Sequence, residues 1–334
     1  MPLELKVTEW STLSPAQATH LLQRPATRNP GLSDRVAEIV RRVRAGGDRA
    51  LAELTRELDG AAPDSLALTE QDLRAAAERI DPELVQAIRG AAARIERFHD
   101  ADRPRDCRIE TAPGLTCEVR YQPLSPVGLY IPGGSAPLVS TVLMLAIPAA
   151  LAGCEEVIMC SPPGQDGRIA DEILAAAHLC GVRSVFCVGG AQAVAAMAFG
   201  TESVPSCAKI FGPGNAWVTE AKQQVSQDPQ GAAIDMPAGP SEVLVIADDG
   251  ADPEHTAWDL LAQAEHGPDS QVVLLTDSRQ LAESVIGQLR RLAPSTPRAA
   301  ILERSLAESR IVLVETIESA LALFHEHGLL AEVA

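Results

Sequence analysis

Gln263 and His266 stand three residues apart, immediately before Gly267-Pro268. The apolar residues upstream predict a helix that ends at this Gly-Pro pair, so both side chains would project from one face of its last turn. A neutral imidazole is a common metal ligand and an amide oxygen is a weaker one, so the two could supply half of a zinc site, which normally needs about four donors. The alternative is a helix end at which His266 caps free carbonyl groups, and the spacing alone favours that alternative.

Four glycine-rich turns lie where predicted strands end, at residues 132–135, 189–190, 212–215 and 237–241. Ligands of open parallel sheets bind beyond the carboxyl ends of the strands, where glycine admits a ligand to the backbone and a following helix offers amides to an anion. However, the chain has no G-x-G-x-x-G after its first strand and no Walker sequence. Any parallel α/β protein needs such turns, so each turn alone indicates a tight turn rather than a cofactor loop.

Four polar residues on or beside these turns are candidates for binding. Tyr130 ends an apolar strand and could stack on a flat cofactor or bond to it, the alternative being a hydroxyl in water. Gln192 lies in the first turn of a predicted helix, and Asn215 either contacts a cofactor or caps the next helix. Ser241 precedes an apolar strand and could be only a turn residue. Taken singly, each position favours the structural explanation.

The elements that would position these residues alternate along the chain. Residues 33–99 are mostly helical, with a break at Gly46-Gly47 and helix starts at Thr69 and at Asp81-Pro82. Short apolar strands and helices then alternate, first to about residue 242 and again from Val243 onward. This alternation predicts an α/β fold with parallel sheets covered on both faces.

Length and charge limit the class of protein. The chain has 334 residues, which favours two or three domains, and 46% of them are hydrophobic. The formal net charge of −17 argues against binding to nucleic acid or to anionic membranes. The longest apolar run, Val139 to Leu151, is shorter than the roughly 18 residues of a spanning helix, and no signal peptide is visible.

The seven cysteines indicate a reducing compartment. Their number is odd, no Cys-x-x-Cys occurs, and several lie in apolar, strand-like runs. We therefore expect reduced core cysteines in a cytoplasmic protein.

In combination, five segments resemble the histidinol dehydrogenase family, which catalyses the last step of histidine biosynthesis. The resemblance runs from about Thr8 to about Leu323 and is strongest in the stretch IDMPAGPSEVLVIAD. The five segments occur in this order: VGLYIPGGSAP (127–137), VGGAQ (188–192), IFGPGN (210–215), IDMPAGPSEVLV (234–245) and QAEHGPDSQ (263–271).

This resemblance implies a zinc-dependent homodimer that oxidises L-histidinol to L-histidine through an aldehyde, with two hydride transfers to NAD. It implies two incomplete Rossmann-like domains with parallel sheets and an N-terminal helical segment. Tyr130, Gln192 and Asn215 match positions that contact NAD, and Ser241 matches a position that contacts substrate. The remaining matched positions, Gln263 and His266, are zinc ligands that also touch substrate.

The family places its proton-transfer groups in a Pro-Glu-His-Leu motif, and here the chain departs from the pattern. A histidine suits proton removal from the alcohol, and a carboxylate suits activation of water for the aldehyde step. The corresponding stretch reads Phe324-His325-Glu326-His327-Gly328 and lacks the proline. Glu326 and His327 are therefore the candidate catalytic pair, and the alternative is a solvated helix end.

The family continues for roughly a further domain beyond this point and places an aspartate and a histidine ligand of the zinc there, whereas this sequence ends at Ala334. We expect a chain that is truncated relative to the family and lacks its C-terminal domain. The expected organisation is an arm (1–32), a first domain (33–129 plus 243–334) and an inserted Rossmann-like domain (130–242). Two alternatives to a histidinol dehydrogenase stay open, namely a paralogue acting on another small polar alcohol and an inactive remnant without two zinc ligands.

Overall fold

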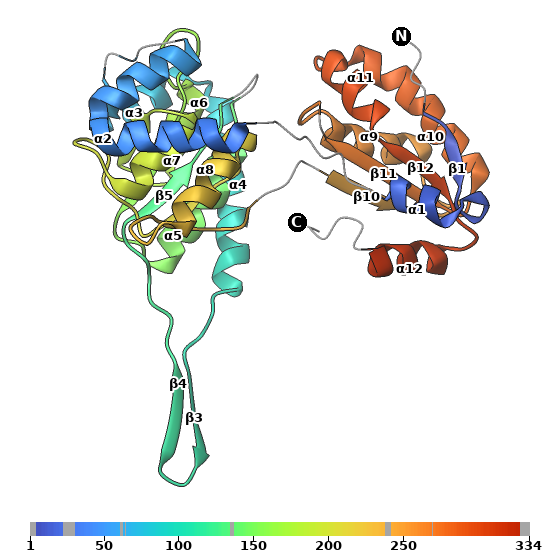
Figure 1. Ribbon diagram of the computed structural model, residues 1–334, viewed down its shortest axis with the longest axis horizontal. Coiled ribbons are helices and arrows are strands. Elements are labelled where there is room, and N and C mark those ends of the chain that lie inside the picture. Colours follow the sequence, from blue (N-terminus) through green and yellow to red (C-terminus); the bar gives the residue numbers. More distant parts are fainter. Residues whose placement is uncertain are drawn as a thin grey trace. The chain divides into compact units, whose positions relative to one another are not determined.

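Residues 5–22, 31–60, 63, 65–133, 137–237, 242–268 and 270–327 are described by a computed structural model, with Glu326 and His327 described by their backbone alone. The chain divides into two compact units: unit 1 comprises Met1–Asn29 and Gly239–Ala334, and unit 2 comprises Pro30–Ala238. Each unit has its own parallel sheet and its own helices (Figure 1). Unit 2 is thus inserted between the two segments of unit 1.

This division differs from the predicted one in two places. Residues 33–129 do not join residues 243–334, because the helices of this region share a hydrophobic core with the central sheet; Val36 and Val43, for example, pack in one cluster with Val188. The predicted arm is part of unit 1, because a strand at Val7–Glu9, which the sequence did not reveal, pairs in parallel with Arg310–Leu313. The inserted unit therefore begins at Pro30 rather than at residue 130.

Within the described part of unit 2, six strands form one sheet in the order β2-β7-β6-β5-β8-β9. Within this sheet, as far as it is described, only the β2–β7 pairing is antiparallel. The five parallel strands have the order 3-2-1-4-5 of a dinucleotide-binding sheet, and the chain switches direction between β5 and β8. The strands are β2 (Ala67–Leu68), β5 (Val127–Tyr130), β6 (Val157–Ser161), β7 (Ser184–Cys187), β8 (Lys209–Phe211) and β9 (Ala233–Ile234).

Helices cover both faces of this sheet. Alternate strand residues point to opposite sides, so that Ile158 packs with α2, α7 and α8, whereas its neighbour Met159 packs with α3 to α6. The helices of unit 2 are α2 (Leu32–Asp59), α3 (Glu70–Arg79), α4 (Pro82–Ala101), α5 (Val139–Ala152), α6 (Asp171–Leu179), α7 (Gly190–Phe199) and α8 (Ala216–Gln227). The expected parallel sheet with two covered faces is confirmed.

Local sequence signals account for the helix starts. The Thr69 and Asp72 side chains form the predicted capping box at α3, and the Asp81 carboxylate accepts from the Glu83 amide at the start of α4. The predicted break at Gly46-Gly47 is a kink inside one helical stretch, where Gly47 has a φ of 55°.

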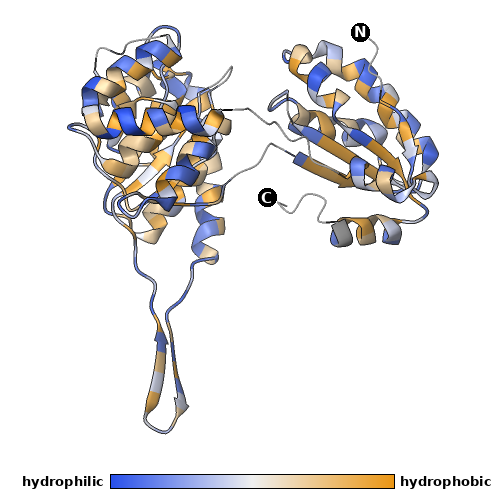
Figure 2. Cartoon of the chain, in the orientation of Figure 1, coloured by the Kyte–Doolittle hydropathy of each residue, from blue (hydrophilic) through white to orange (hydrophobic). Residues whose placement is uncertain are grey.

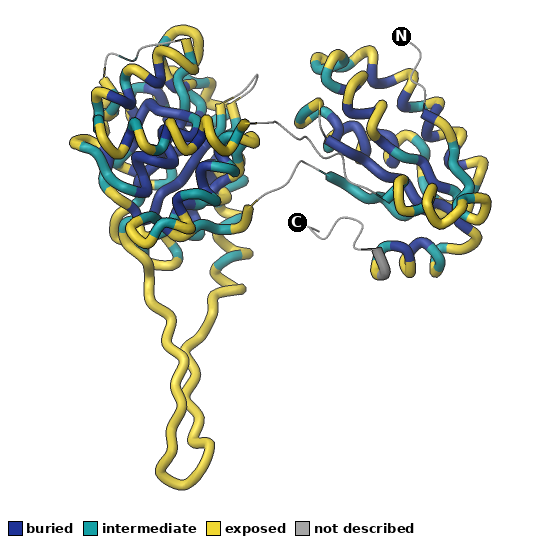
Figure 3. The backbone as a smooth tube through the Cα atoms, viewed as in Figure 1, coloured by how far each residue is buried: buried dark blue, intermediate teal, exposed yellow. Residues whose placement is uncertain are grey.

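A β-hairpin extends from unit 2 between α4 and β5 (Figure 3). Its strands β3 (Cys107–Ala112) and β4 (Leu115–Val119) are antiparallel and exposed at every residue. Hydrophobic and hydrophilic residues mix along it, as Figure 2 shows. Cys107 and Cys117 lie here, so the expectation of core cysteines is wrong for these two, while Cys160, Cys187 and Cys207 are buried.

The described part of unit 1 contains a four-stranded parallel sheet in the order β1-β12-β11-β10. Leu274 faces α9 to α11, and its neighbour Leu275 faces α12 and residues of the N-terminal segment. The strands are β1 (Val7–Glu9), β10 (Glu242–Ile246), β11 (Gln271–Thr276) and β12 (Arg310–Leu313). The helices are η1 (Trp10–Thr12), α1 (Pro15–Leu21), α9 (Pro253–Ala264), α10 (Arg279–Leu292), η2 (Ala293–Ser295), α11 (Ala299–Ala307) and α12 (Ile317–His327). No helix in the described ranges is both long enough and apolar enough to cross a bilayer.

Candidate dinucleotide-binding site

The carboxyl edge of the unit 2 sheet carries the three residues expected to contact NAD. Tyr130 ends β5, Gln192 lies in the first turn of α7 after β7, and Asn215 caps α8 after β8. The strands are parallel, so their carboxyl ends share one edge, and β5 and β8 flank the point at which the strand order reverses. This is the place at which doubly wound sheets bind their ligands.

Tyr130 connects two of the turns at this edge. Its hydroxyl oxygen accepts a hydrogen bond from the Gly190 N–H at 3.0 Å, and its carbonyl oxygen lies against Gly212, whose Cβ, if present, would be 2.2 Å away. The residue is 3% exposed, so the alternative of a hydroxyl in water is wrong. Burial raises the pKa of the phenol to about 12, so Tyr130 stays protonated at neutral pH and positions backbone rather than removing protons.

Gln192 is 1% exposed and holds its amide in one orientation. Its Nε2 donates to Asp59 Oδ2 at 3.2 Å, while Oε1 has no partner within the described residues. Gly190 has a φ of 63°, and a Cβ there would lie 2.6 Å from Gln192 Oε1, so only glycine fits at the start of this helix. A buried acceptor without a partner costs about 1–3 kcal/mol and indicates a site that a ligand or water completes.

Asp59, at the end of α2, was not predicted as a site residue. Its carboxylate accepts from Gln192, and desolvation by burial raises its pKa above the ordinary 3.8. No sequence pattern selects it, because an aspartate before Gly60 is typical of an ordinary helix end.

Asn215 caps helix α8, as the structural alternative for this residue predicted. Its Oδ1 accepts from the amides of Trp217 and Val218 at 3.0 and 3.2 Å. The residue is exposed, so its side-chain amide nitrogen lies at the surface of this edge. Capping and cofactor contact are therefore compatible, since the cap uses only the amide oxygen.

The expected zinc ligands lie on unit 1. The helix α9 ends at Ala264 with Glu265 as its C-cap, two residues earlier than predicted, so His266 stands beyond the helix and not on its last turn. The His266 amide, rather than its imidazole, bonds to the Gln263 carbonyl at 3.2 Å. Gln263 is half-buried and His266 is exposed. Across the described ranges no group of three or more His, Cys, Asp or Glu residues could hold a metal ion.

The structure describes little of the other three predicted residues. Ser241 lies outside the described residues. The backbone of Glu326 and His327 forms the end of α12, which agrees with the alternative of a helix end, and nothing is described of their side chains.

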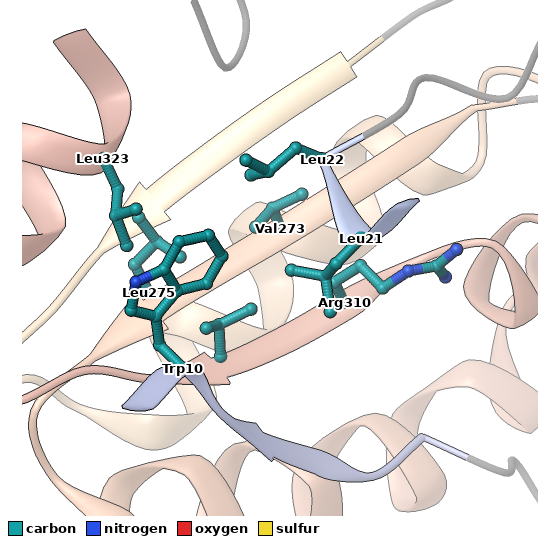
Figure 4. Close-up of a pocket in the computed structure, with 8 residues that line it drawn as sticks. Trp10, Leu21, Leu22, Val273, Leu275, Arg310 and Leu323 are labelled. Carbon is teal, nitrogen blue, oxygen red and sulfur yellow. The ribbon is translucent and has the colours of Figure 1, made fainter. Parts of the chain in front are cut away.

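Two hollows elsewhere do not suit a dinucleotide. One in unit 1 holds only about 10 Å³ between Trp10, Leu22 and the sheet, which is room for one water molecule at most (Figure 4). The other, of about 490 Å³, is lined by four carboxylates and by only two arginines. Of these two, Arg79 is already bonded to Asp171 at 2.6 Å, so the wall repels phosphate.

Comparisons with known proteins agree with this geometry. The family model of histidinol dehydrogenase matches residues 22–328. The histidinol dehydrogenases of Vibrio vulnificus and Xanthomonas euvesicatoria are 51% and 53% identical to this chain over 97% of its length, and the match covers 74% and 75% of theirs. The crystal structure of histidinol dehydrogenase from Elizabethkingia anophelis superposes with a TM-score of 0.89 at 42% identity, covering 94% of this chain and 72% of that one. The chain belongs to the histidinol dehydrogenase family.

Proposed function

We propose that this chain oxidises L-histidinol to L-histidine in two NAD-dependent steps, through the aldehyde. One observation carries the proposal beyond family membership. Tyr130 joins the first turn of α7 to the loop after β8, at the reversal point of a sheet with dinucleotide-binding strand order. This edge supports a dinucleotide site assembled from the three turns that the family motifs occupy.

NAD, when bound, accepts the hydride in each step. The residues proposed to hold it are Tyr130, Gln192 and Asn215, and the edge suits such a ligand in two respects. The helix α7 begins at Gly190 and has no side-chain cap. The Gly190 amide bonds to the Tyr130 hydroxyl, so the next amides of this first turn are the groups proposed to face a phosphate. Gln192 Oε1, which has no hydrogen-bond partner among the described residues, can accept a hydrogen bond from the nucleotide.

The substrate loses a proton with each hydride, and the aldehyde must also gain water. We propose Glu326 and His327 for these proton transfers, on the family resemblance and on their place at the end of α12. A histidine with a pKa near neutrality suits removal of the alcohol proton, and a carboxylate suits activation of water. Ser241 is proposed as a substrate contact on the same resemblance.

For zinc, the donor set in the described chain is too small. Gln263 and His266 supply two donors, no cluster of three or more ligating residues occurs among the described residues, and a zinc site needs about four. The pair remains our proposal for part of a metal and substrate site. No chemical step in this proposal depends on the metal.

The test measures NADH formation at 340 nm with L-histidinol and NAD, beside NAD binding by thermal shift. Gln192→Leu should raise the KM for NAD about tenfold, because it removes the buried amide at the first turn of α7 and with it about one hydrogen bond to the nucleotide. Gln227→Leu, at the exposed far end of α8, is the matched control and should leave the KM unchanged.

The outcomes separate the alternatives. Turnover with histidinol supports the proposal, and turnover only with other small polar alcohols indicates a paralogue. NAD binding without turnover on any alcohol indicates an inactive remnant, and neither binding nor turnover rejects the proposal. A homodimer and a cytoplasmic location stay predictions from the resemblance and the cysteine usage, and light scattering of the purified chain tests the first.

A further inference from the structure

An ion pair between a buried lysine and a partly buried aspartate holds the loop after β8 from both sides. Lys222, on α8, is 3% exposed, and its Nζ donates to the Gly212 carbonyl oxygen at 2.8 Å and to Asp235 Oδ1. Asp235 follows β9, and its Oδ2 accepts from the Gly212 N–H at 2.8 Å. The two side chains therefore bond to each other and to both polar groups of one glycine.

Gly212 is the residue at which the loop must be held. Its φ of 123° lies in the region that only glycine adopts without strain. A Cβ would stand 2.2 Å from the Tyr130 carbonyl oxygen, so the backbone passes directly against the end of β5. Asn215, the proposed NAD contact, lies three residues further on, so the position of Gly212 sets the position of this side chain.

Both partners are themselves fixed by regular structure. The Asp235 amide donates to the Ile210 carbonyl at 3.2 Å, which continues the β8–β9 pairing by one residue. Lys222 shares the buried face of α8 with Val218, Ala221 and Val225. A lysine on an apolar helix face is unusual unless it is paired, so this position calls for an explanation.

Stability alone does not account for the pair. Replacing both members of a buried ion pair by apolar residues is often neutral or stabilising, whereas removing one member leaves an uncompensated charge. Apolar residues cannot, however, bond to the Gly212 amide and carbonyl. These two bonds are what the charged pair supplies and an apolar pair would lack.

We propose that Lys222 and Asp235 are positioning residues, which fix the loop 212–215 so that Asn215 and the loop backbone meet the dinucleotide. The proposal rests on the proposed function of this edge in binding NAD. It assigns a role to the aspartate of the family stretch IDMPAGPSEV, which the NAD, zinc and proton-transfer assignments leave unused.

The experiment compares Lys222→Met, Lys222→Met/Asp235→Val and the unchanged chain. Urea denaturation measures stability, NAD titration by thermal shift measures affinity, and hydrogen exchange of the peptide around residues 211–216 reports on the loop without NAD. The single variant should lose stability and affinity together. The double variant should recover the part of the stability that the single variant loses to the unpaired Asp235 charge, yet bind NAD at least about tenfold more weakly and exchange this peptide faster. Arg79→Met, which breaks the ion pair to Asp171 on α6, is the control and should leave NAD binding and the exchange unchanged.

Loop exchange and NAD affinity that stay at the unchanged chain's values in the stable double variant would overturn the proposal. If the double variant does not fold, Asp235→Asn, which keeps the side-chain volume, is judged by the same two readouts. Failure of the unchanged chain to bind NAD would count against the proposed function alone, because hydrogen exchange still decides whether the pair holds the loop.

Discussion

Replacing Tyr130 by phenylalanine tests how the carboxyl edge of unit 2 is held together. The substitution keeps the buried ring and removes only the hydroxyl oxygen that accepts from the Gly190 N–H at 3.0 Å. Gly190 is the first residue of α7, so the change leaves one helix-terminal amide without its acceptor.

The expected loss follows from the burial of the two groups. Leaving a buried donor without a partner costs about 1–3 kcal/mol, and the half-burial of Gly190 places the expected value at about 1–2 kcal/mol. For a unit of roughly 200 residues this corresponds to a fall in Tm of about 2–8 °C. The assay is urea denaturation followed by the fluorescence of Trp217, which lies in unit 2, with Trp10 and Trp258 of unit 1 replaced by phenylalanine.

The chain provides its own control, because its only other tyrosine is Tyr121, which is 55% exposed. Tyr121→Phe should change the free energy of unfolding by less than about 0.5 kcal/mol. Equal effects of the two substitutions would refute the reasoning, since they would mean that the Gly190 amide does not depend on Tyr130.

Three further results are expected. Burial raises the pKa of Asp59 above 3.8, so the ionised carboxylate lowers the stability of the folded chain at neutral pH. This cost disappears as the pH falls through the raised pKa to 3.8, so Asp59→Asn should be more stable than the unchanged chain at pH 7 and lose that advantage in thermal unfolding at acid pH. Because Gln263 and His266 are joined by no cluster of three or more ligating residues in the part of the chain that the structure describes, the purified chain should retain far less than one zinc per subunit after dialysis against a chelator, and its Tm should not change. A full equivalent by metal analysis would contradict this. Cys107 and Cys117 are exposed, so they should react first with a thiol reagent, and a double serine variant that keeps the fast phase would show the hairpin assignment to be wrong.

The sequence predicted the elements of the fold correctly where a local pattern marked each strand or helix. Hydrophobic runs followed by glycine turns placed β5 to β8 and their helices within a few residues of their observed bounds. The predictions that were wrong concern contacts between segments that lie far apart in the sequence. Nothing local in Val7–Glu9 shows that it pairs with Arg310–Leu313, and nothing local shows that α2 covers the sheet of unit 2. The division into domains was misjudged for this reason.

The sequence predicted which residues form the candidate site better than it predicted their contacts. Motif resemblance selected Tyr130, Gln192 and Asn215, and the structure places all three at one edge. The residues that hold them were missed, although Lys222 carried a readable signal as a charge on an apolar helix face. Asp59 carried no such signal, because its role appears only once α2 and α7 lie together.

The edge also limits what a mutation can prove. Tyr130 uses its hydroxyl for the amide of Gly190, and Asn215 uses its amide oxygen to cap α8. These two residues thus each first satisfy a backbone group of the turn beside them, because buried or helix-terminal amides require partners. Substituting either one will lower stability and affinity together, so weaker binding alone does not identify a contact. A direct contact with NAD is shown only when the loss of affinity exceeds the loss that the measured changes in stability and in loop exchange account for. Variants of Lys222 and Asp235, which bond to Gly212, measure how much affinity is lost when only the loop is loosened.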